Sequence, residues 1–518
     1  MTGESYDVVV VGSGAGLIGA YTAASRGLRT LVIEKTEFLG GTTAYSGAGI
    51  WLPGNAAELR AGVEDSPEAA RPYLDALVGD DAPAVLREAF LQGGPVMIEE
   101  LEQNHWFQWF QWLGVPDYFA DAPGALAQGR TIFPPDLNRS ELRNLEPLLR
   151  RPLWTERWGV DVPPMMVGGQ ALIARALLAF LETGNGSVRT NTALERLLVE
   201  DGRVVGIEAL SEGERVTIRA EKGVILASGG FERNAELRAR YQPGLTDEWT
   251  QGCEGNTGDA LLAGLEIGAD TSLLDEAWFA PGLVVPGTRP VFYTTVWSGI
   301  WVGADGQRYL NERLPYDRAG HEMRRAGQEA STHWIFDQRQ IDNERAFAAL
   351  PVGPDVPGWF DVERFLAAGV LERADTLEEL AERIGLPAGV LTKTVEEFNG
   401  YARSGVDEQF HRGEAPWDRT IEYLAGPHTD GPNPCLGVLD RGPFYAAKIV
   451  LSDLGTKGGL VTDAAARVLR PDGSVIGGLY ASGNTMAPAT GRIYPGAGGP
   501  IGSSMVFSYL AAVDLAQQ

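Results

Sequence analysis

The sequence contains few cysteines and histidines for its 518 residues. Its two cysteines, Cys253 and Cys435, cannot form a disulfide framework or a thiolate metal site, which favours a reducing compartment. None of the five histidines has metal-ligand spacing, so we expect no bound metal. The sequence also lacks an apolar run of about 18 residues and a basic N-terminal region followed by an apolar stretch. We therefore expect a cytoplasmic protein with no membrane span and no signal peptide.

Positive charge is also scarce. Lysine and arginine total 43 against 69 aspartate and glutamate residues, which gives a net charge of −26. A chain this acidic repels phosphate backbones, which argues against a nucleic-acid partner and favours a neutral, apolar substrate. The length exceeds what one ordinary hydrophobic core supports, so we expect at least two domains.

The first 34 residues have the pattern of a dinucleotide-binding unit. An apolar strand over 7–11 is followed by glycines at positions 12, 14 and 16, a helix over 17–25 and a strand over 31–33. The glycines permit a tight turn and a close approach of backbone to phosphate, and the helix N-terminus offers free N–H groups. Glu34, which ends the second strand, is placed to accept both ribose hydroxyls. The candidate contacts here are Gly12, Ser13, Gly14, Ala15, Gly16, Glu34 and Lys35.

The segment 38–49 distinguishes a flavin from a nicotinamide. It combines glycines with small and hydroxyl residues, which let the backbone pass close to a flat ring and leave hydroxyls free to bond phosphate or flavin edges. Together with the phosphate turn, it predicts FAD as the cofactor, the alternative being a glycine-rich loop without a ligand. The candidate contacts in this segment are Gly40, Gly41, Thr42, Thr43, Ser46, Gly47 and Ala48.

Later segments indicate that the flavin domain is discontinuous. Hairpin strands are expected over 188–208, and two apolar strands, over 222–230 and 476–484, end in glycines. A glycine-rich turn at 494–501 leads into a helix over 502–514. The remaining candidate cofactor contacts are Gly229, Asp259, Gly483, Asn484, Pro500 and Ile501.

These segments predict an α/β protein with a Rossmann-like FAD-binding domain built on a parallel sheet. We assign residues 1–275 and 450–518 to this domain and 276–449 to an inserted α+β substrate domain. The inserted domain has a strand pattern over 291–302 and helical patterns over 360–404.

Longer motifs resemble those of the 3-ketosteroid Δ1-dehydrogenases, flavoproteins of steroid-degrading bacteria. The resemblance covers nearly the whole chain and lies in GSGAG, GGTTAYSGAGIWLPGN, PDYFADAPGA, YLNERLPYDRAG, LSDLGTKGGLVTDAAARVLRPDG, ASGNT and YPGAGGPIGSSMVFSYLAA. It implies that FAD accepts a hydride from C1 of a 3-ketosteroid while a base removes a proton from C2. It also implies that an external, quinone-like acceptor reoxidises the flavin.

The resemblance carries four catalytic residues to this sequence. Tyr494 matches the donor to the steroid C3 carbonyl, and Gly498 matches the glycine whose N–H assists it. Tyr316 matches the base for C2, and Tyr118 matches the tyrosine that supports this base. Many relatives have a second tyrosine after Tyr118, where this chain has Phe119. Two donors aimed at the C3 oxygen form an oxyanion hole, which makes the neighbouring C2–H acidic.

The aromatic segment 105–113 has helical spacing, with Trp106, Trp109, Phe110 and Leu113 on one face. Three interpretations remain open: core packing, an apolar lid over a flat substrate, and a patch for peripheral membrane contact. For the whole chain, the alternatives are a Δ4-(5α)-ketosteroid dehydrogenase, a fumarate-reductase-like enzyme and a non-catalytic flavin- or steroid-binding module.

Overall fold

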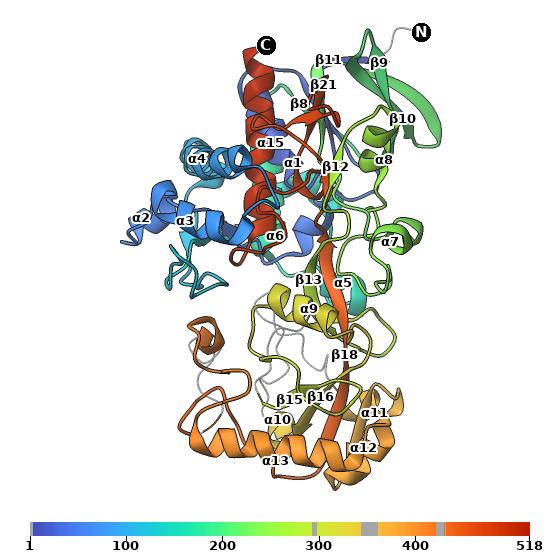
Figure 1. The fold of residues 1–518 in the computed structure, drawn as a ribbon. Helices are drawn as coiled ribbons and strands as arrows, with labels where there is room; N and C mark the ends of the chain where they lie inside the picture. Colours follow the sequence, from blue (N-terminus) through green and yellow to red (C-terminus); the bar gives the residue numbers. More distant parts are fainter. Residues whose placement is uncertain (1–3, 293–297, 343–360, 421–428, 430) are drawn as a thin grey trace. The chain divides into compact units, whose positions relative to one another are not determined.

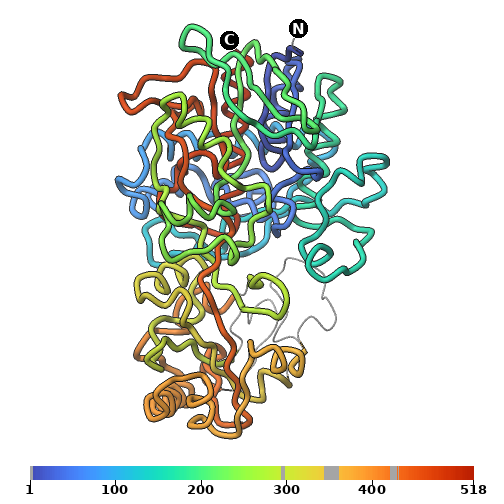
Figure 2. Tube along the Cα trace, turned by 90° about the vertical axis from the view of Figure 1, so that its right-hand side faces the viewer, coloured from blue at the N-terminus to red at the C-terminus, as the bar shows by residue number. Residues whose placement is uncertain are grey.

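The computed structural model describes residues 4–292, 298–342, 361–420, 429 and 431–518. The chain forms two compact units. Unit 1 contains Met1–Pro243, Gly252–Trp278 and Gly455–Gln518, and unit 2 contains Gly244–Gln251 and Phe279–Leu454. Unit 1 therefore combines segments from both ends of the chain, which Figure 2 traces in blue and red.

An eight-stranded sheet forms the centre of unit 1. Its main order is β20-β21-β11-β1-β2-β8, and the hairpin β9–β10 continues from β11. β1 pairs in parallel with β2 and β11, β2 with β8, and β11 with β21. The strands are β1 (Glu4–Val11), β2 (Thr30–Ile33), β8 (Gly186–Arg189), β9 (Thr192–Glu200), β10 (Arg203–Ser211), β11 (Glu214–Leu226), β20 (Arg467–Leu469) and β21 (Val475–Ala481). The parallel core and its discontinuous strands confirm the predicted α/β class with a parallel sheet.

Long helices pack beside this sheet. α1 (Gly16–Ser25) contacts both α6 (Gly168–Glu182) and α15 (Gly499–Gln517), which runs alongside α1 in Figure 1. A Cβ atom at Gly19 would lie 2.7 Å from the Ser508 carbonyl oxygen, so glycine permits the close approach of α1 and α15. This contact joins the N-terminal and C-terminal segments in one core.

Shorter elements complete unit 1. They are η1 (Gly41–Tyr45), β3 (Ile50–Trp51), α2 (Ala56–Arg60), α3 (Pro67–Val78), α4 (Ala84–Leu101), η2 (His105–Phe107), β4 (Gln111–Trp112), β5 (Thr131–Phe133), β6 (Leu137–Asn138), η3 (Arg139–Leu148), α5 (Leu153–Trp158), β7 (Met165–Met166), α7 (Ala235–Tyr241), α8 (Asp259–Glu266), β12 (Thr271–Ser272), β19 (Gly459–Leu460) and η5 (Gly483–Thr485).

Unit 2 is built on a second, six-stranded sheet with the main order β14-β13-β18-β16-β15, in which β17 also pairs with β18. Its strands are β13 (Ala277–Leu283), β14 (Val291–Phe292), β15 (Ile300–Val302), β16 (Thr332–Asp337), β17 (Leu371–Ala374) and β18 (Phe444–Thr456). Its helices are α9 (Tyr316–Arg325), α10 (Gln338–Asp342), α11 (Val362–Ala367), α12 (Leu377–Ile384), α13 (Ala388–Ser404) and η4 (Trp417–Arg419). Apolar residues of α12 and α13 form one core with β15 and β16.

Two expectations need correction. The segment 105–113 is not one continuous helix: it forms the short 3-10 helix η2 and the strand β4, which pairs with β5. Phe110 is buried, whereas Trp109 and Leu113 are exposed, so these residues do not share one buried face. The segment 291–302 does not form the single expected strand: it contains β14 and β15, which stand at opposite ends of the sheet order, and its residues 293–297 lie outside the described part of the chain.

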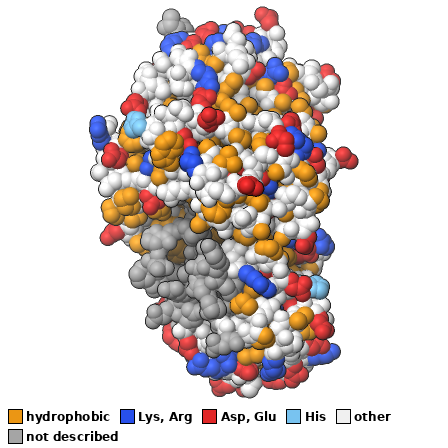
Figure 3. All heavy atoms as spheres, turned by 90° about the vertical axis from the view of Figure 1, so that its left-hand side faces the viewer, with side chains coloured by type: hydrophobic (Ala, Val, Ile, Leu, Met, Phe, Trp, Pro, Cys, Tyr) orange, Lys and Arg blue, Asp and Glu red, His pale blue; other side chains and the backbone are white. Residues whose placement is uncertain are grey.

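The surface in Figure 3 carries acidic, basic and hydrophobic side chains interspersed with one another. Among the residues that the structure describes, no helix is both long and apolar enough to cross a bilayer. Both cysteines are buried, and they form no disulfide with each other.

Candidate functional site

The turn between β1 and α1 has the geometry of a phosphate-binding loop. Gly12 has φ +104°, and a Cβ atom there would lie 2.4 Å from the Ala227 carbonyl oxygen. At Gly16, a Cβ atom would lie 2.8 Å from the Ala227 side chain. Among the hydrogen bonds of the described residues, none uses the backbone N–H of Ala15 or Gly16. The start of α1 therefore has N–H groups available to bond an anion.

Glu34 follows β2 and is buried beside this turn. Its Oε2 accepts a hydrogen bond from Ser13 Oγ at 2.6 Å, and its Oε1 accepts from the Thr36 N–H at 3.0 Å. Ser13 Oγ in turn accepts from the Gly40 N–H at 2.9 Å. These bonds hold the carboxylate in one orientation and leave it lone pairs for further donors, as a ribose contact requires.

Lys35 and Asp259, which the sequence assigned to the cofactor separately, pair with each other. Lys35 Nζ lies 2.7 Å from Asp259 Oδ2 and also donates to Thr257 Oγ1. The pair joins the end of β2 to the first turn of α8. Both side chains are about a quarter exposed, so the structure gives them an interaction within the protein in addition to any contact with a ligand.

The small-residue strip lies close to the phosphate turn and bends sharply. Gly40 has φ +120° and precedes η1. Gly47 lies just after η1, between Ser46 and Ala48. Ser46 Oγ donates to the Thr43 carbonyl at 2.7 Å and accepts from the Ala48 N–H at 3.1 Å. The strip is thus held by its own hydroxyl groups.

Thr42 connects the strip to the segment after β11. Its Oγ1 accepts from the Cys253 N–H and from Asn256 Nδ2, both at 3.0 Å. Gly229 has φ +82°, and a Cβ atom there would lie 2.7 Å from Asn256 Oδ1. Thr42 and Gly229 therefore meet the same asparagine, although they are far apart in the sequence.

The C-terminal candidates lie at η5 and at the start of α15. Gly483 opens η5 with φ +61°, and Asn484 Oδ1 accepts a hydrogen bond from Trp278 Nε1 at 2.9 Å. Pro500 and Ile501 are in the first turn of α15, which begins directly after Gly498. A helix N-terminus favours negative charge close to it.

The residues of unit 1 fit a dinucleotide. A phosphate turn with free N–H groups, a buried carboxylate at the end of the neighbouring strand and a small-residue strip occur in one compact unit. A Cβ atom at Gly14 would lie 3.2 Å from Thr43 Oγ1, so the absence of a side chain there lets the phosphate turn and the small-residue strip approach closely.

Tyr494 and Tyr118 lie side by side in unit 1. Their ring centroids are 5.3 Å apart, and both side chains are almost completely buried. The carbonyl of Pro495 joins their segments, because it accepts from the Tyr118 N–H at 3.1 Å and from Tyr73 Oη at 2.5 Å. The structure therefore brings together two of the three predicted catalytic tyrosines within this unit.

Gly498 lies at the end of the same turn and precedes α15. Its φ is +92°, and a Cβ atom there would lie 2.0 Å from the carbonyl carbon and oxygen of Gly49. Among the described residues, none accepts a hydrogen bond from the Gly498 N–H. The turn thus requires glycine and leaves a backbone donor available four residues after Tyr494.

A buried ion cluster behind Tyr118 was missed by the sequence analysis. Arg130 binds Asp117, the neighbour of Tyr118, and Arg130 Nε lies 2.8 Å from Asp65 Oδ2. Asp117 also accepts from Trp51 Nε1 at 2.8 Å. Burial raises the pKa of Asp117 to about 6, against the opposing effect of Arg130. Asp117 is adjacent to the PDYF tyrosine, but its partners lie too far along the chain to be inferred from the motif.

Tyr316 is the first residue of α9 in unit 2. It is half-buried, and its ring meets the Phe292 ring edge-on at 5.0 Å between centroids. The next residue, Asp317, accepts from the Phe279 N–H at 3.1 Å and so anchors the start of α9.

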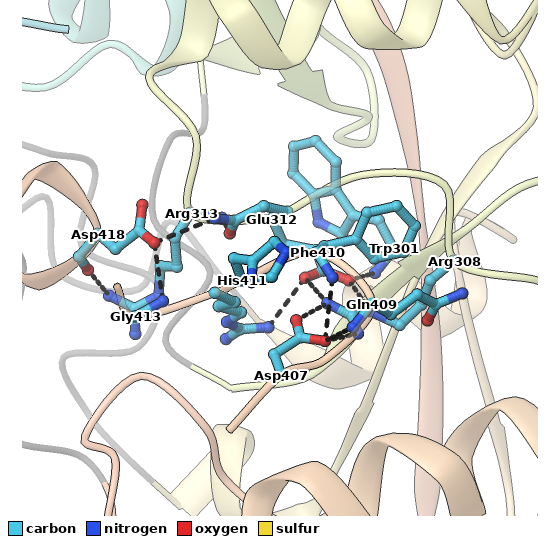
Figure 4. A network of polar contacts seen from close by, with 12 residues as sticks. Trp301, Arg308, Glu312, Arg313, Asp407, Gln409, Phe410, His411, Gly413 and Asp418 are labelled. Atoms are coloured by element: carbon cyan, nitrogen blue, oxygen red, sulfur yellow. Dashed lines mark hydrogen bonds and ion pairs between the residues drawn. The ribbon is translucent and has the colours of Figure 1, made fainter. Parts of the chain in front are cut away.

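The segment before Tyr316 enters a buried network of ion pairs (Figure 4). Arg308 forms a two-point contact with Glu312, with both N···O distances 2.8 Å, and also pairs with Asp407 at 2.8 Å. Glu312 accepts in addition from Arg412 Nη1 at 3.2 Å. Because these side chains are buried, the network holds the segment 308–312 in a single arrangement.

Comparisons with known proteins agree with this geometry. The family model described as an FAD binding domain matches residues 7–501. A 3-oxosteroid 1-dehydrogenase of Mycolicibacterium smegmatis is 43% identical over 100% of this chain and 98% of that protein. A 4-oxocyclohexanecarboxylate 2-dehydrogenase of Sinomonas cyclohexanicum is 35% identical over 99% of this chain and 93% of that protein.

Among solved structures, the 3-ketosteroid Δ1-dehydrogenase of Sterolibacterium denitrificans, in complex with 1,4-androstadiene-3,17-dione, superposes with a TM-score of 0.88. It is 34% identical, and the match covers 99% of this chain and 100% of that one. The fold and the match to the FAD-binding model define an FAD-dependent oxidoreductase. Within that class, the chain belongs to the 3-oxosteroid 1-dehydrogenase family.

Proposed function

We propose that this chain catalyses the FAD-dependent 1,2-dehydrogenation of 3-ketosteroids. The observation that carries the proposal is the arrangement of Tyr118, Tyr494 and Gly498 in a chain of this family. Tyr494 and the Gly498 N–H supply two donors from one rigid turn, as the C3 oxygen of a ketosteroid requires.

Each residue has a separate task in this reaction. Tyr494 Oη and the Gly498 N–H bind the C3 oxygen and stabilise the negative charge that develops there as C2 loses its proton. We assign to Tyr316 the role of proton acceptor and to Tyr118 the role of supporting the basic form of that residue. FAD, when bound, accepts the hydride from C1, so that two hydrogens leave the A ring in total.

Unit 1 and unit 2 have different roles in the proposal. We assign FAD to the domain of residues 1–275 and 450–518, and much of the substrate recognition to the domain of residues 276–449. The cofactor contacts remain those proposed from the sequence, with Glu34 binding the adenosine ribose and the start of α1 binding the pyrophosphate.

An external acceptor, which we take to be quinone-like, must remove two electrons after each turnover. We place the protein in the cytoplasm with a peripheral membrane contact. Steroids and quinones both partition into membranes, so this contact would bring the protein close to its substrate and its acceptor. The exposed side chains of Trp109 and Leu113 support this contact, since apolar rings on a surface favour a lipid interface.

Anaerobic mixing with a 3-ketosteroid tests the proposal. We expect the yellow absorption of the oxidised flavin to bleach in proportion to the steroid added, because no acceptor is present. A binding module would bind the steroid and keep its colour, and this result would overturn the proposed activity.

A further inference from the structure

Lys457 is a buried cation that the proposed mechanism does not use. This residue comes directly after β18 in the chain and belongs to unit 1, and it is only 1% exposed. Nζ donates to the Arg492 carbonyl at 2.5 Å, and the Lys457 N–H donates to the Glu276 carbonyl at 2.9 Å. Burial of an ammonium group is costly, so its partners within the protein must stabilise the charge.

The Lys457 ammonium faces an aromatic ring that leads to the candidate oxyanion donor. Nζ lies 4.4 Å from the centroid of the Trp278 ring, within the range of a cation–π interaction. The Trp278 ring meets Tyr494 edge-on, with centroids 5.2 Å apart and an interplanar angle of 79°. Trp278 is itself buried and oriented by its hydrogen bond to Asn484.

We propose that Lys457 supports Tyr494 through Trp278 as a positioning residue with an electrostatic effect. The cation holds the Trp278 ring in the orientation that packs against Tyr494. It also supplies positive potential at the Tyr494 ring, whose hydroxyl we assign to the C3 oxygen. This inference rests on the proposed function, because it assigns a role in the same reaction.

The size of the effect follows from the separations. The two ring contacts place Nζ within about 10 Å of the Tyr494 ring centre. At an effective dielectric constant of about 20, a unit charge about 10 Å from an oxyanion changes the equilibrium stability of that oxyanion about tenfold, which sets the order of magnitude expected here. The neighbouring Arg492 contributes less net charge, because its guanidinium pairs with Asp275 and Glu276.

The test compares Lys457→Met, Lys457→Arg and wild type, each loaded with FAD. The rate of deuterium exchange at C2 of a 3-ketosteroid is measured with oxidised enzyme and no electron acceptor, together with the steroid dissociation constant. A steroid with a phenolic A ring serves as a probe of oxyanion binding. Lys393→Met is the control, because it also removes one positive charge and its side chain is 75% exposed.

We expect Lys457→Met to slow C2 exchange and to weaken phenolic-steroid binding about tenfold each. In Lys457→Met the dissociation constant of the 3-ketosteroid should change less than about twofold. Lys457→Arg should recover most of the lost exchange and phenol binding. The control Lys393→Met should match wild type in all three measurements. Wild-type exchange and wild-type phenol binding in Lys457→Met would overturn the inference. Equal losses in exchange, ketosteroid affinity and FAD content would also overturn it, because they indicate a structural role alone.

A second variant and the wild-type exchange rate cover the cases in which Lys457→Met does not fold or the proposed function is wrong. If Lys457→Met does not fold, Trp278→Phe takes its place, since it keeps a ring between Lys457 and Tyr494 but loses the bond to Asn484. It should lower exchange while FAD remains bound, and unchanged exchange would contradict the inference. Failure of the proposed function is distinguishable, because wild-type protein would then exchange no C2 hydrogen.

Discussion

Replacing Gly498 with alanine should disable the oxyanion donors while leaving the flavin bound. The added Cβ atom would lie 2.0 Å from the Gly49 carbonyl carbon and oxygen and 2.5 Å from the Ile50 nitrogen, where ordinary contacts begin at 3.4 Å. The neighbours are backbone atoms, so the turn itself must move by more than 1 Å. The φ of +92° adds a penalty of roughly 1–2 kcal/mol for a residue with a side chain.

A shift of this size removes the N–H of residue 498 from its position and disturbs Tyr494 in the same turn. Loss of one oxyanion donor elsewhere lowers kcat about 10²–10³-fold. We therefore expect Gly498→Ala to lose at least about 10²-fold in kcat, measured by steady-state reduction of an artificial electron acceptor. The FAD content, measured by absorbance after purification, should stay close to that of wild type.

Gly473→Ala provides a matched control in the same unit. Gly473 has a similar φ of +81°, but a Cβ atom there meets nothing within 4 Å. This variant should lose stability by about 1 kcal/mol through backbone strain and keep its activity. If Gly498→Ala turned over at the wild-type rate, the assignment of the Gly498 N–H as an oxyanion donor would be refuted.

Three other changes probe separate parts of the account. Tyr316→Phe should abolish both turnover and C2 deuterium exchange, because it removes the proton acceptor, while steroid binding persists; exchange at the wild-type rate would show that Tyr316 is not the base. Glu34→Ala should weaken FAD affinity by about one to two orders of magnitude through loss of a charged hydrogen-bond acceptor, measured by flavin release, and unchanged affinity would contradict the ribose contact. Burial raises the pKa of Glu58 to about 8, so the folded protein holds this proton at a pH where the unfolded chain has lost it. Stability should therefore fall as the pH rises from about 4.5 to 8, and Glu58→Gln should flatten that fall in denaturant titrations; an unchanged pH profile would contradict the raised pKa.

The parts of the fold that the sequence predicted depend on local patterns. β1, the glycine turn, α1 and β2 are contiguous, and each has a distinct period or turn residue, so their order could be derived from the sequence. The helix α15 and the strand β21 were found for the same reason. The dinucleotide-binding unit followed because the glycines and Glu34 are linked by a spacing that the parallel sheet imposes, and the small-residue segment 38–49 then indicated a flavin.

The parts that could not be predicted depend on contacts between distant segments. The segment 105–113 has helical spacing, yet it forms η2 and β4, because pairing with β5 and burial of Phe110 outweigh the weak periodicity. The cluster of Asp65, Asp117 and Arg130 joins three segments with no common motif. In the same way, nothing in the motif around Lys457 indicates that Trp278 covers it.

The position of the new double bond tests the central claim most directly. A 5α-saturated 3-ketosteroid offers both the C1–C2 and the C4–C5 bond, and the product of a single anaerobic turnover can be identified by mass spectrometry and NMR. The account predicts bleaching of the flavin with a double bond only between C1 and C2. A product unsaturated between C4 and C5, or bleaching by 4-oxocyclohexanecarboxylate and not by the steroid, would contradict it.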